Sequence, residues 1–155
     1  YRPEDQIQLS DPYYWNYMED AMTMVVHRAF NSVFRDYGTA YQSIAQADPE
    51  MSYRMAGKSG TAQVVSIDQS ILRSQDIQVA DQHKDHGLFI SFAPAQHPTI
   101  KPQIALAVFV ENGESGSSVA GPIAKQIVDS YLLDILDLNL QSPDSPAEIS
   151  AVAAE

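Results

Sequence analysis

Residues 54–64 of the chain are RMAGKSGTAQV, and the structure of this short stretch decides the fold around it. The letters Gly57-Lys58-Ser59 end a phosphate-binding loop if a strand precedes them and a helix follows. The same letters serve a different chemistry if they lie within a β-strand. The sequence on either side therefore has to distinguish between the two structures.

The flanking sequence argues against a nucleotide-binding loop. The position that should hold the first glycine of that motif is Ser52. The residues between, 53–56, are mostly bulky where backbone amides would have to approach phosphate. The letters GTAQVVSI that follow are typical of a strand, so no helix N-terminus would point at an anion. No second acidic motif for magnesium follows. The sequence thus excludes nucleotide binding at this motif.

A β-strand over residues 55–67 fits better, because small and β-branched residues dominate this stretch. Alternation along a strand would place Lys58 and Gly60 on one face, and Ser59 and Thr61 on the other. Gly60 has no side chain, so the backbone of a substrate could lie close against the strand. A strand edge with one cation and two hydroxyls suits an extended peptide that ends in a carboxylate.

Two amphipathic helices are predicted on either side of the strand region. The first covers residues 9–38, where Asp11 or Ser10 is suited to cap the start and Gly38 to end the helix. The second follows the glycine- and serine-rich turn at residues 113–122. The expected apolar stripe of the first helix is Trp15, Met18, Met22, Val25, Val26, Ala29 and Val33. That of the second is Ile123, Ile127, Val128, Tyr131, Leu132 and Ile135.

Two further strands are predicted at residues 87–94 and 102–112. The second is mostly apolar, which favours a buried central strand. Short links between strands favour antiparallel pairing, so the order helix, strand, strand, strand, helix predicts an α+β fold, an antiparallel sheet flanked by helices. We expect residues 1–138 to belong to one domain and residues 139–155 to form a flexible acidic tail.

Composition and charge exclude several functional classes. The formal net charge is −11, from 20 acidic and 9 basic residues, and such a surface repels nucleic acid. The chain has no cysteine, which excludes thiol nucleophiles, disulfides and thiolate metal sites. No apolar run approaches the roughly 20 residues that span a membrane. Because the chain begins YRPEDQ, without an initiator methionine, we expect it to be a piece of a longer protein.

One cluster of residues could suggest a metal site. It is the segment DQHKDH, which holds Asp81, His83, Asp85 and His86. These residues lack the fixed helical or turn spacing that would make their side chains converge, so a solvated loop is favoured. We expect neither a metal nor a cofactor.

Three blocks of sequence, in order, resemble one family. Lys-Ser-Gly is the third motif of the penicillin-interacting serine acyltransferases. The blocks YRMAGKSGTAQVV (53–65), DHGLFISFAP (85–94) and IALAVFVENGESGSSVAGPIAKQIVD (104–129) resemble the elongation-specific class B penicillin-binding proteins, which are peptidoglycan D,D-transpeptidases of Gram-negative bacteria. The resemblance is strong over residues 50–135. It implies part of the transpeptidase fold shared by penicillin-binding proteins and serine β-lactamases.

The resemblance assigns roles to the motif residues. Lys58 would hydrogen-bond toward the serine of the second family motif and supply positive potential. The hydroxyls of Ser59 and Thr61, with Gly60 between them, would bind the carboxylate of a D-Ala-D-Ala stem peptide or of a β-lactam. The backbone N–H of Thr61 would be one of two oxyanion-hole donors. The alternative for Lys58 is an ordinary exposed lysine on a strand.

The nucleophile of the family is missing from this chain. The motif Ser-x-x-Lys needs a serine three residues before a lysine, and these positions hold Met55, Asp81, Pro98 and Pro122. The chain has no Ser-x-Asn either. Both motifs lie N-terminal to Lys-Ser-Gly in the family. We therefore expect the chain to supply one wall of a cleft, to depend on the N-terminal remainder of the same domain, and to be inactive alone.

The resemblance also implies partners and a location. The expected partners are peptidoglycan stem peptides, β-lactam antibiotics and a SEDS-type glycosyltransferase of the elongation machinery. The expected location is the periplasmic face of the bacterial inner membrane, with the anchor outside this chain. The alternative function is a non-catalytic module of the same fold that binds a peptide or a protein partner.

Overall fold

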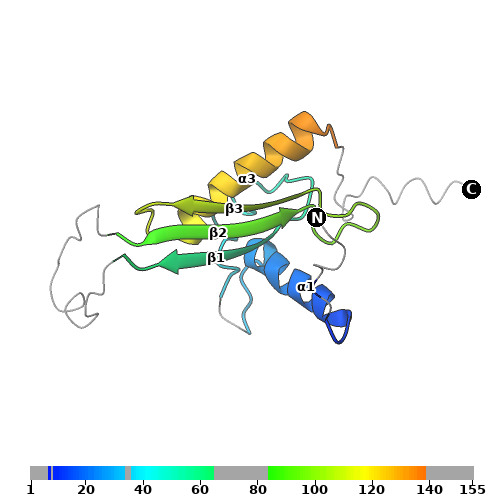
Figure 1. The fold of residues 1–155 in the computed structure, drawn as a ribbon, viewed down its shortest axis with the longest axis horizontal. Coiled ribbons are helices and arrows are strands. Elements are labelled where there is room, and N and C mark those ends of the chain that lie inside the picture. The colour runs from blue at the N-terminus through cyan, green and yellow to red at the C-terminus, as the bar shows by residue number, and fades with distance from the viewer. Residues whose placement is uncertain (1–6, 8, 34–35, 65–83, 139–155) are drawn as a thin grey trace, which may run out of the picture.

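The computed structural model describes residues 7, 9–33, 36–64 and 84–138, and Figure 1 shows its elements. They follow in the predicted order of helix, three strands and helix. They are α1 (Tyr13–His27), β1 (Ala56–Ala62), β2 (His86–Ala93), β3 (Ile104–Val110) and α3 (Gly121–Asp129). The π-helical segments η3 (Gly116–Ala120) and η4 (Ser130–Ile135) extend α3 at its two ends. The tail expected at residues 139–155 lies outside the described residues, and no helix in the described part has the length and apolarity to span a bilayer.

The strands form one antiparallel sheet in the order β1-β2-β3, which confirms the predicted α+β class. Among the described residues β3 is an edge strand, so the prediction that residues 102–112 form a buried central strand is not met within this part of the chain. Its exposure also alternates residue by residue, because one face of the strand packs on a helix and the other does not.

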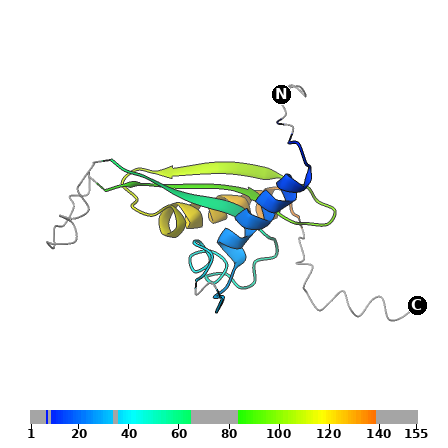
Figure 2. The ribbon, with the colours of Figure 1, turned by 90° about the horizontal axis from the view of Figure 1, so that it is seen from below.

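The core lies between the sheet and α3. Figure 2 shows the sheet nearly edge-on, with α3 against one of its faces. Phe89 of β2 and Val128 of α3 are fully buried there. Ile44, from the segment between α1 and β1, joins the same cluster. The helix α1 contacts β1, and Figure 1 places it on the β1 side of the sheet.

Helix α1 is shorter than the sequence predicts, and it ends at His27 instead of near Gly38. Arg28 is already extended, and the chain then turns back on the helix. The carbonyl oxygens of Val25 and Arg28 accept hydrogen bonds from the backbone N–H groups of Ala40 (2.9 Å) and Gly38 (2.8 Å). Tertiary pairing therefore replaces the next helical turn, and the expected stripe is buried only in part. Its exposed members are Trp15, Met18, Ala29 and Val33.

The C-terminal helix buries a different face from the one predicted. Its buried row runs at four-residue spacing through Ala120, Ala124, Val128 and Leu132. Of these only the last two belong to the predicted stripe. Three of the larger predicted residues are exposed, Ile123 by 39%, Ile127 by 45% and Ile135 by 69%. The small residues allow close packing on the sheet, and the isoleucines line a shallow groove beside Ile104 of β3.

Candidate functional site

The motif of residues 57–61 lies entirely within strand β1, as the sequence predicts, and the strand leads into no helix within the described residues. A phosphate-binding loop is thus absent here. Gly57 is required for packing, because a Cβ atom at this position would lie 2.5 Å from Cζ of Phe89. The first glycine of the motif therefore belongs to the core, and the surface chemistry begins at Lys58.

The pairing of β1 with β2 confirms the predicted alternation of the motif side chains. Lys58 is opposite Ile90, which is half exposed on the outer face of the sheet, whereas Ser59 is opposite the buried Phe89. Residues directly opposite each other in an antiparallel pair project to the same face. Lys58 thus lies on the outer face with Gly60, and Ser59 lies on the α3 face with Thr61.

The polar atoms of the motif are accessible. The side chains of Lys58 and Thr61 are exposed, and that of Ser59 is half-buried. The Nζ atom of Lys58 donates a hydrogen bond to the backbone oxygen of Ser59 at 2.5 Å. In the described part of the sheet β1 has a strand neighbour on one side only.

The turn before α3 supports the motif strand from the α3 face. A Cβ atom at Gly116 would overlap the backbone of Gly60 and the carbonyl oxygen of Leu88. The predicted strand-to-helix turn is therefore confirmed, and its glycine permits the chain to pass directly against β1. The side chain of Ser115 caps this turn by accepting a hydrogen bond from the N–H of Ser118 at 3.2 Å.

A half-buried histidine joins α1 to the start of the motif strand. Nε2 of His27 accepts a hydrogen bond from the backbone N–H of Met55 at 3.0 Å. Burial of the imidazole, and next the positive charge of Arg54, lower the pKa of His27 to about 4. The ring is therefore neutral near pH 7, which leaves Nε2 free to accept this bond. Sequence patterns gave no indication of the contact, because it joins residues 28 positions apart.

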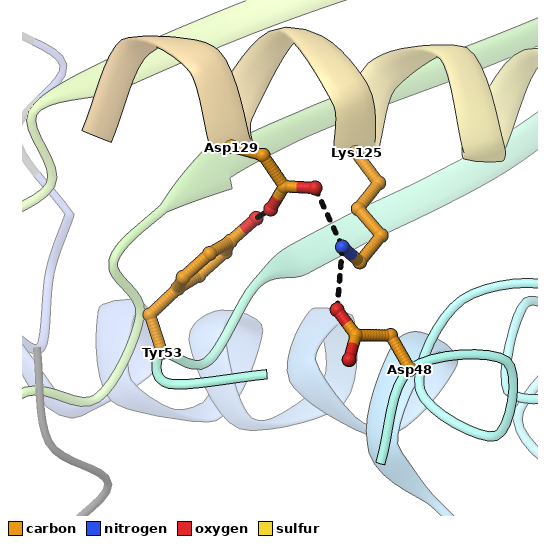
Figure 3. Close-up of polar contacts among 4 residues, drawn as sticks. All are labelled: Asp48, Tyr53, Lys125 and Asp129. Atoms are coloured by element: carbon orange, nitrogen blue, oxygen red, sulfur yellow. Dashed lines mark hydrogen bonds and ion pairs between the residues drawn. The ribbon is translucent and has the colours of Figure 1, made fainter. Parts of the chain in front are cut away.

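The segment that leads into β1 is fastened to α3 by a polar network, which Figure 3 shows. The hydroxyl of Tyr53 donates to Asp129 at 2.6 Å. Lys125 contacts Asp129 at 2.6 Å and Asp48 at 2.7 Å. Burial, and next the hydrogen bond to Asp129, raise the pKa of Tyr53. For Lys125 burial lowers the pKa, but the two carboxylates outweigh burial and raise it overall.

The far end of the motif strand lies beside the start of β2. Nδ1 of His86 accepts a hydrogen bond from the N–H of Asn112 at 2.9 Å, and its ring packs edge-on to Phe109. His86 thus orders the turn between β3 and η3. Two members of the possible metal cluster, Asp81 and His83, lie outside the described residues. Within the described ranges no three histidine, aspartate or glutamate side chains converge as metal ligands would.

Residues 2–129 match the family described as penicillin binding protein transpeptidase domain. The chain belongs to this family. The match spans both the motif strand and α3, so the penicillin-binding-protein resemblance that rested on three short blocks holds over most of the chain.

Relatives and one solved structure narrow the likeness within the transpeptidase-domain family. The chain is 48% identical over 81 residues to peptidoglycan D,D-transpeptidase MrdA of Acinetobacter baumannii, covering 52% of this chain and 11% of that protein. It is 36% identical over 141 residues to MrdA of Escherichia coli K12, covering 91% of this chain and 19% of that protein.

One structural neighbour is a complex between penicillin-binding protein (PBP2) and MreC from Helicobacter pylori. The TM-score is 0.51 and the identity is 26%, over 84% of this chain and 21% of that chain. The chain therefore spans about a fifth, or less, of the length of each of these proteins. The likeness supports the transpeptidase fold class that the sequence predicts.

Proposed function

We propose that this chain is the C-terminal segment of a peptidoglycan D,D-transpeptidase, and that β1 forms one wall of its active-site cleft. The observation that carries the proposal is the motif strand itself. It presents Lys58 and two hydroxyls, Ser59 and Thr61, along one accessible strand of the sheet. Membership of the transpeptidase-domain family and the likeness to MrdA proteins support the same function.

The proposed chemistry is acyl transfer through a serine of the remaining part of the domain. That serine attacks the carbonyl of the penultimate D-Ala of a stem peptide, and the terminal D-Ala leaves with a proton. An amine of a neighbouring stem peptide then takes the acyl group and releases the serine. A β-lactam opens its ring on the same serine and leaves a stable acyl-enzyme.

Within this scheme the motif residues bind and polarise the substrate. Ser59 and Thr61 donate hydrogen bonds to the terminal carboxylate, a charge-assisted contact worth about 1.5–3 kcal/mol. The backbone N–H of Thr61 is one of two donors to the oxyanion, and losing such a donor typically costs about 2.7–4 kcal/mol of transition-state stabilisation. Lys58 supplies positive potential on the neighbouring face of the strand. Gly60 lets the substrate backbone approach.

The chain alone is proposed to be inactive, because it contains neither Ser-x-x-Lys nor Ser-x-Asn. Its first partner is then the N-terminal remainder of the same domain, which supplies the nucleophile. Further proposed partners are stem peptides, β-lactams and a SEDS-type glycosyltransferase, at the periplasmic face of the bacterial inner membrane. By analogy with the H. pylori complex, an MreC-type protein is another candidate.

Labelling with a fluorescent penicillin tests the proposal. The full-length protein that contains this chain should be labelled covalently at a serine outside these 155 residues, and the 155-residue chain alone should not be labelled. Peptide mapping identifies the labelled residue. Labelling of the chain alone would show that the nucleophile is misplaced. A full-length protein that binds stem peptide but takes no label would favour the non-catalytic binding module.

A further inference from the structure

The hydroxyl of Thr39 lies beside the motif strand, although it is 20 residues away in sequence. Its Oγ1 atom is 3.5 Å from Oγ of Ser59. Hydroxyl pairs that satisfy each other usually lie about 2.7–2.8 Å apart. At the observed separation the two groups bond each other poorly, but one acceptor oxygen can still reach both. The side chain of Thr39 is exposed and that of Ser59 is half-buried, so such an acceptor can arrive from solvent.

The backbone around Thr39 is held on both sides by helix α1. The N–H of Gly38 donates to the carbonyl oxygen of Arg28 at 2.8 Å, and the N–H of Ala40 donates to that of Val25 at 2.9 Å. Gly38 passes so close to the helix that a Cβ atom would overlap the carbonyl of Met24. Ala40 is fully buried. Thr39 is therefore the one accessible side chain of a fixed Gly38-Thr39-Ala40 tripeptide.

The segment after Thr39 is held by contacts with η3 and α3. The hydroxyl of Ser43 donates to the backbone oxygen of Ser117 at 2.7 Å. Asp48 pairs with Lys125 of α3 at 2.7 Å, as Figure 3 shows. Anchoring to α1, η3 and α3 limits the conformations open to this segment. A hydroxyl held in this way loses little freedom when it binds a ligand.

We propose that Thr39 is a further substrate-contacting residue, which donates a hydrogen bond together with Ser59 to the carboxylate of the stem peptide or β-lactam. The inference rests on the proposed function, and it adds a residue from outside the Lys-Ser-Gly-Thr motif. A carboxylate is the favoured acceptor, because two hydroxyl donors bind an anionic oxygen better than a neutral one. The hydroxyls of Thr39 and Ser59 would therefore bind the charged carboxylate of the substrate together.

The test measures acylation of the full-length protein by benzylpenicillin, with the binding constant KI and the acylation rate constant kinact determined separately. Thr39→Val keeps the shape and removes the hydroxyl, and it should raise KI about tenfold, the lower end expected for a bond to a charged group, with kinact nearly unchanged. Thr39→Ser retains the hydroxyl and should stay within about threefold of the unmodified protein. The midpoint of thermal unfolding should be unchanged in both variants, because Thr39 is exposed.

Ser43→Ala is the matched control, since it removes a hydroxyl of the same segment that bonds the backbone of Ser117. It should lower thermal stability and leave KI unchanged. Thr39→Val should still raise KI at least about threefold in a Ser59→Ala background, because the proposed contact is direct. Loss of the effect in that background would reduce Thr39 to a residue that only orients Ser59, and would overturn the proposal.

The outcome for the unmodified protein separates this inference from the proposed function. If the unmodified full-length protein is not acylated, the proposed function fails and the contact has no carboxylate to bind. If it is acylated, and Thr39→Val has the same KI, only the role of Thr39 is wrong.

Discussion

At the scale of single residues, the positions around the motif strand differ in why a glycine is needed there. Gly57 gives room to the ring of Phe89, and Gly116 gives room to the backbone of Gly60. For Gly60 itself, an added Cβ atom would meet only Cβ of Leu88, at an ordinary 3.5 Å. The fold therefore does not need a glycine at position 60. If one is needed, the reason must be a molecule that approaches the strand from outside.

This difference gives a prediction for Gly60→Ala in the full-length protein. Its free energy of unfolding should stay within about 1 kcal/mol of the unmodified value, because an alanine fits this position and orders the strand slightly better. Acylation by fluorescent penicillin should slow by on the order of 100-fold, because a methyl group displaces the ligand from its reactive position.

Gly57→Ala is the control for this prediction, and its main effect should be a loss of stability. The added methyl collides with the buried ring of Phe89, so the unfolding free energy should fall by about 1–3 kcal/mol, the usual range for overpacking. A Gly60→Ala protein that is acylated at the unmodified rate would contradict close approach of the ligand at this glycine.

The motif and its faces could be predicted from the sequence because both depend on neighbouring residues. Alternation along a strand places Lys58 and Ser59 on opposite faces wherever the strand lies. The position of Thr39 could not be predicted in this way. Its contact with Ser59 depends on how the chain folds back after α1, and no local pattern encodes that path.

At the scale of elements, tertiary structure ends α1 earlier than its apolar spacing predicts. The apolar spacing continues past His27, so the sequence favours a longer helix. Turn-forming side chains were the missed signal. Asn31 accepts a hydrogen bond from the N–H of Val33, and Asp36 accepts one from the N–H of Tyr37. These local bonds compete with the helix, and the returning chain then pairs with its last carbonyl groups.

The contact between His27 and Met55 predicts how stability depends on pH. The folded pKa of His27, about 4, is below the value of about 6.5 for an unfolded histidine. Between these values the unfolded state binds more protons than the folded state. Stability should therefore be complete above pH 6.5 and fall as the pH drops toward 4, by at most about 1.4 kcal/mol per pH unit from this group.

The measurement is the free energy of unfolding of the full-length protein against pH, compared with that of His27→Gln. Near pH 7 the variant should keep most of this hydrogen bond, because the amide oxygen of Gln can accept from the N–H of Met55 in place of Nε2. Between pH 6.5 and 4 its stability should fall less steeply than that of the unmodified protein. Equal slopes would show that His27 titrates alike in the folded and unfolded states.

At the scale of the whole molecule, two apolar surfaces of the described residues have no covering layer. One is the outer face of the sheet, where Ile90 is 50% and Phe109 58% exposed. The other is the groove along α3 and β3 that the exposed isoleucines line. Contiguous apolar surface of this kind usually belongs to an interface. It is consistent with a chain that covers only about a fifth of the length of its E. coli relative.

The apolar surfaces and the net charge have opposite effects on self-association of the isolated 155-residue chain, and this predicts how its association depends on salt. Its net charge of −11 opposes self-association at low salt, whereas the exposed apolar surface favours it. Salt screens the charge over about 10 Å at 0.1 M and about 3 Å at 1 M, and leaves the apolar attraction intact. Sedimentation at micromolar concentration should therefore show larger species as salt increases, and a dye for apolar surfaces should bind at low salt.

Replacing two exposed residues tests whether the outer face of the sheet is responsible. The double variant Ile90→Thr and Phe109→Ser should associate less and bind less dye, because both side chains lie on that face and outside the core. Phe89→Ser is the matched control on the same strand. It empties a fully buried position, so it should unfold the chain and increase dye binding. A chain that remains monomeric at high salt and binds no dye would mean that these surfaces are covered within the chain itself.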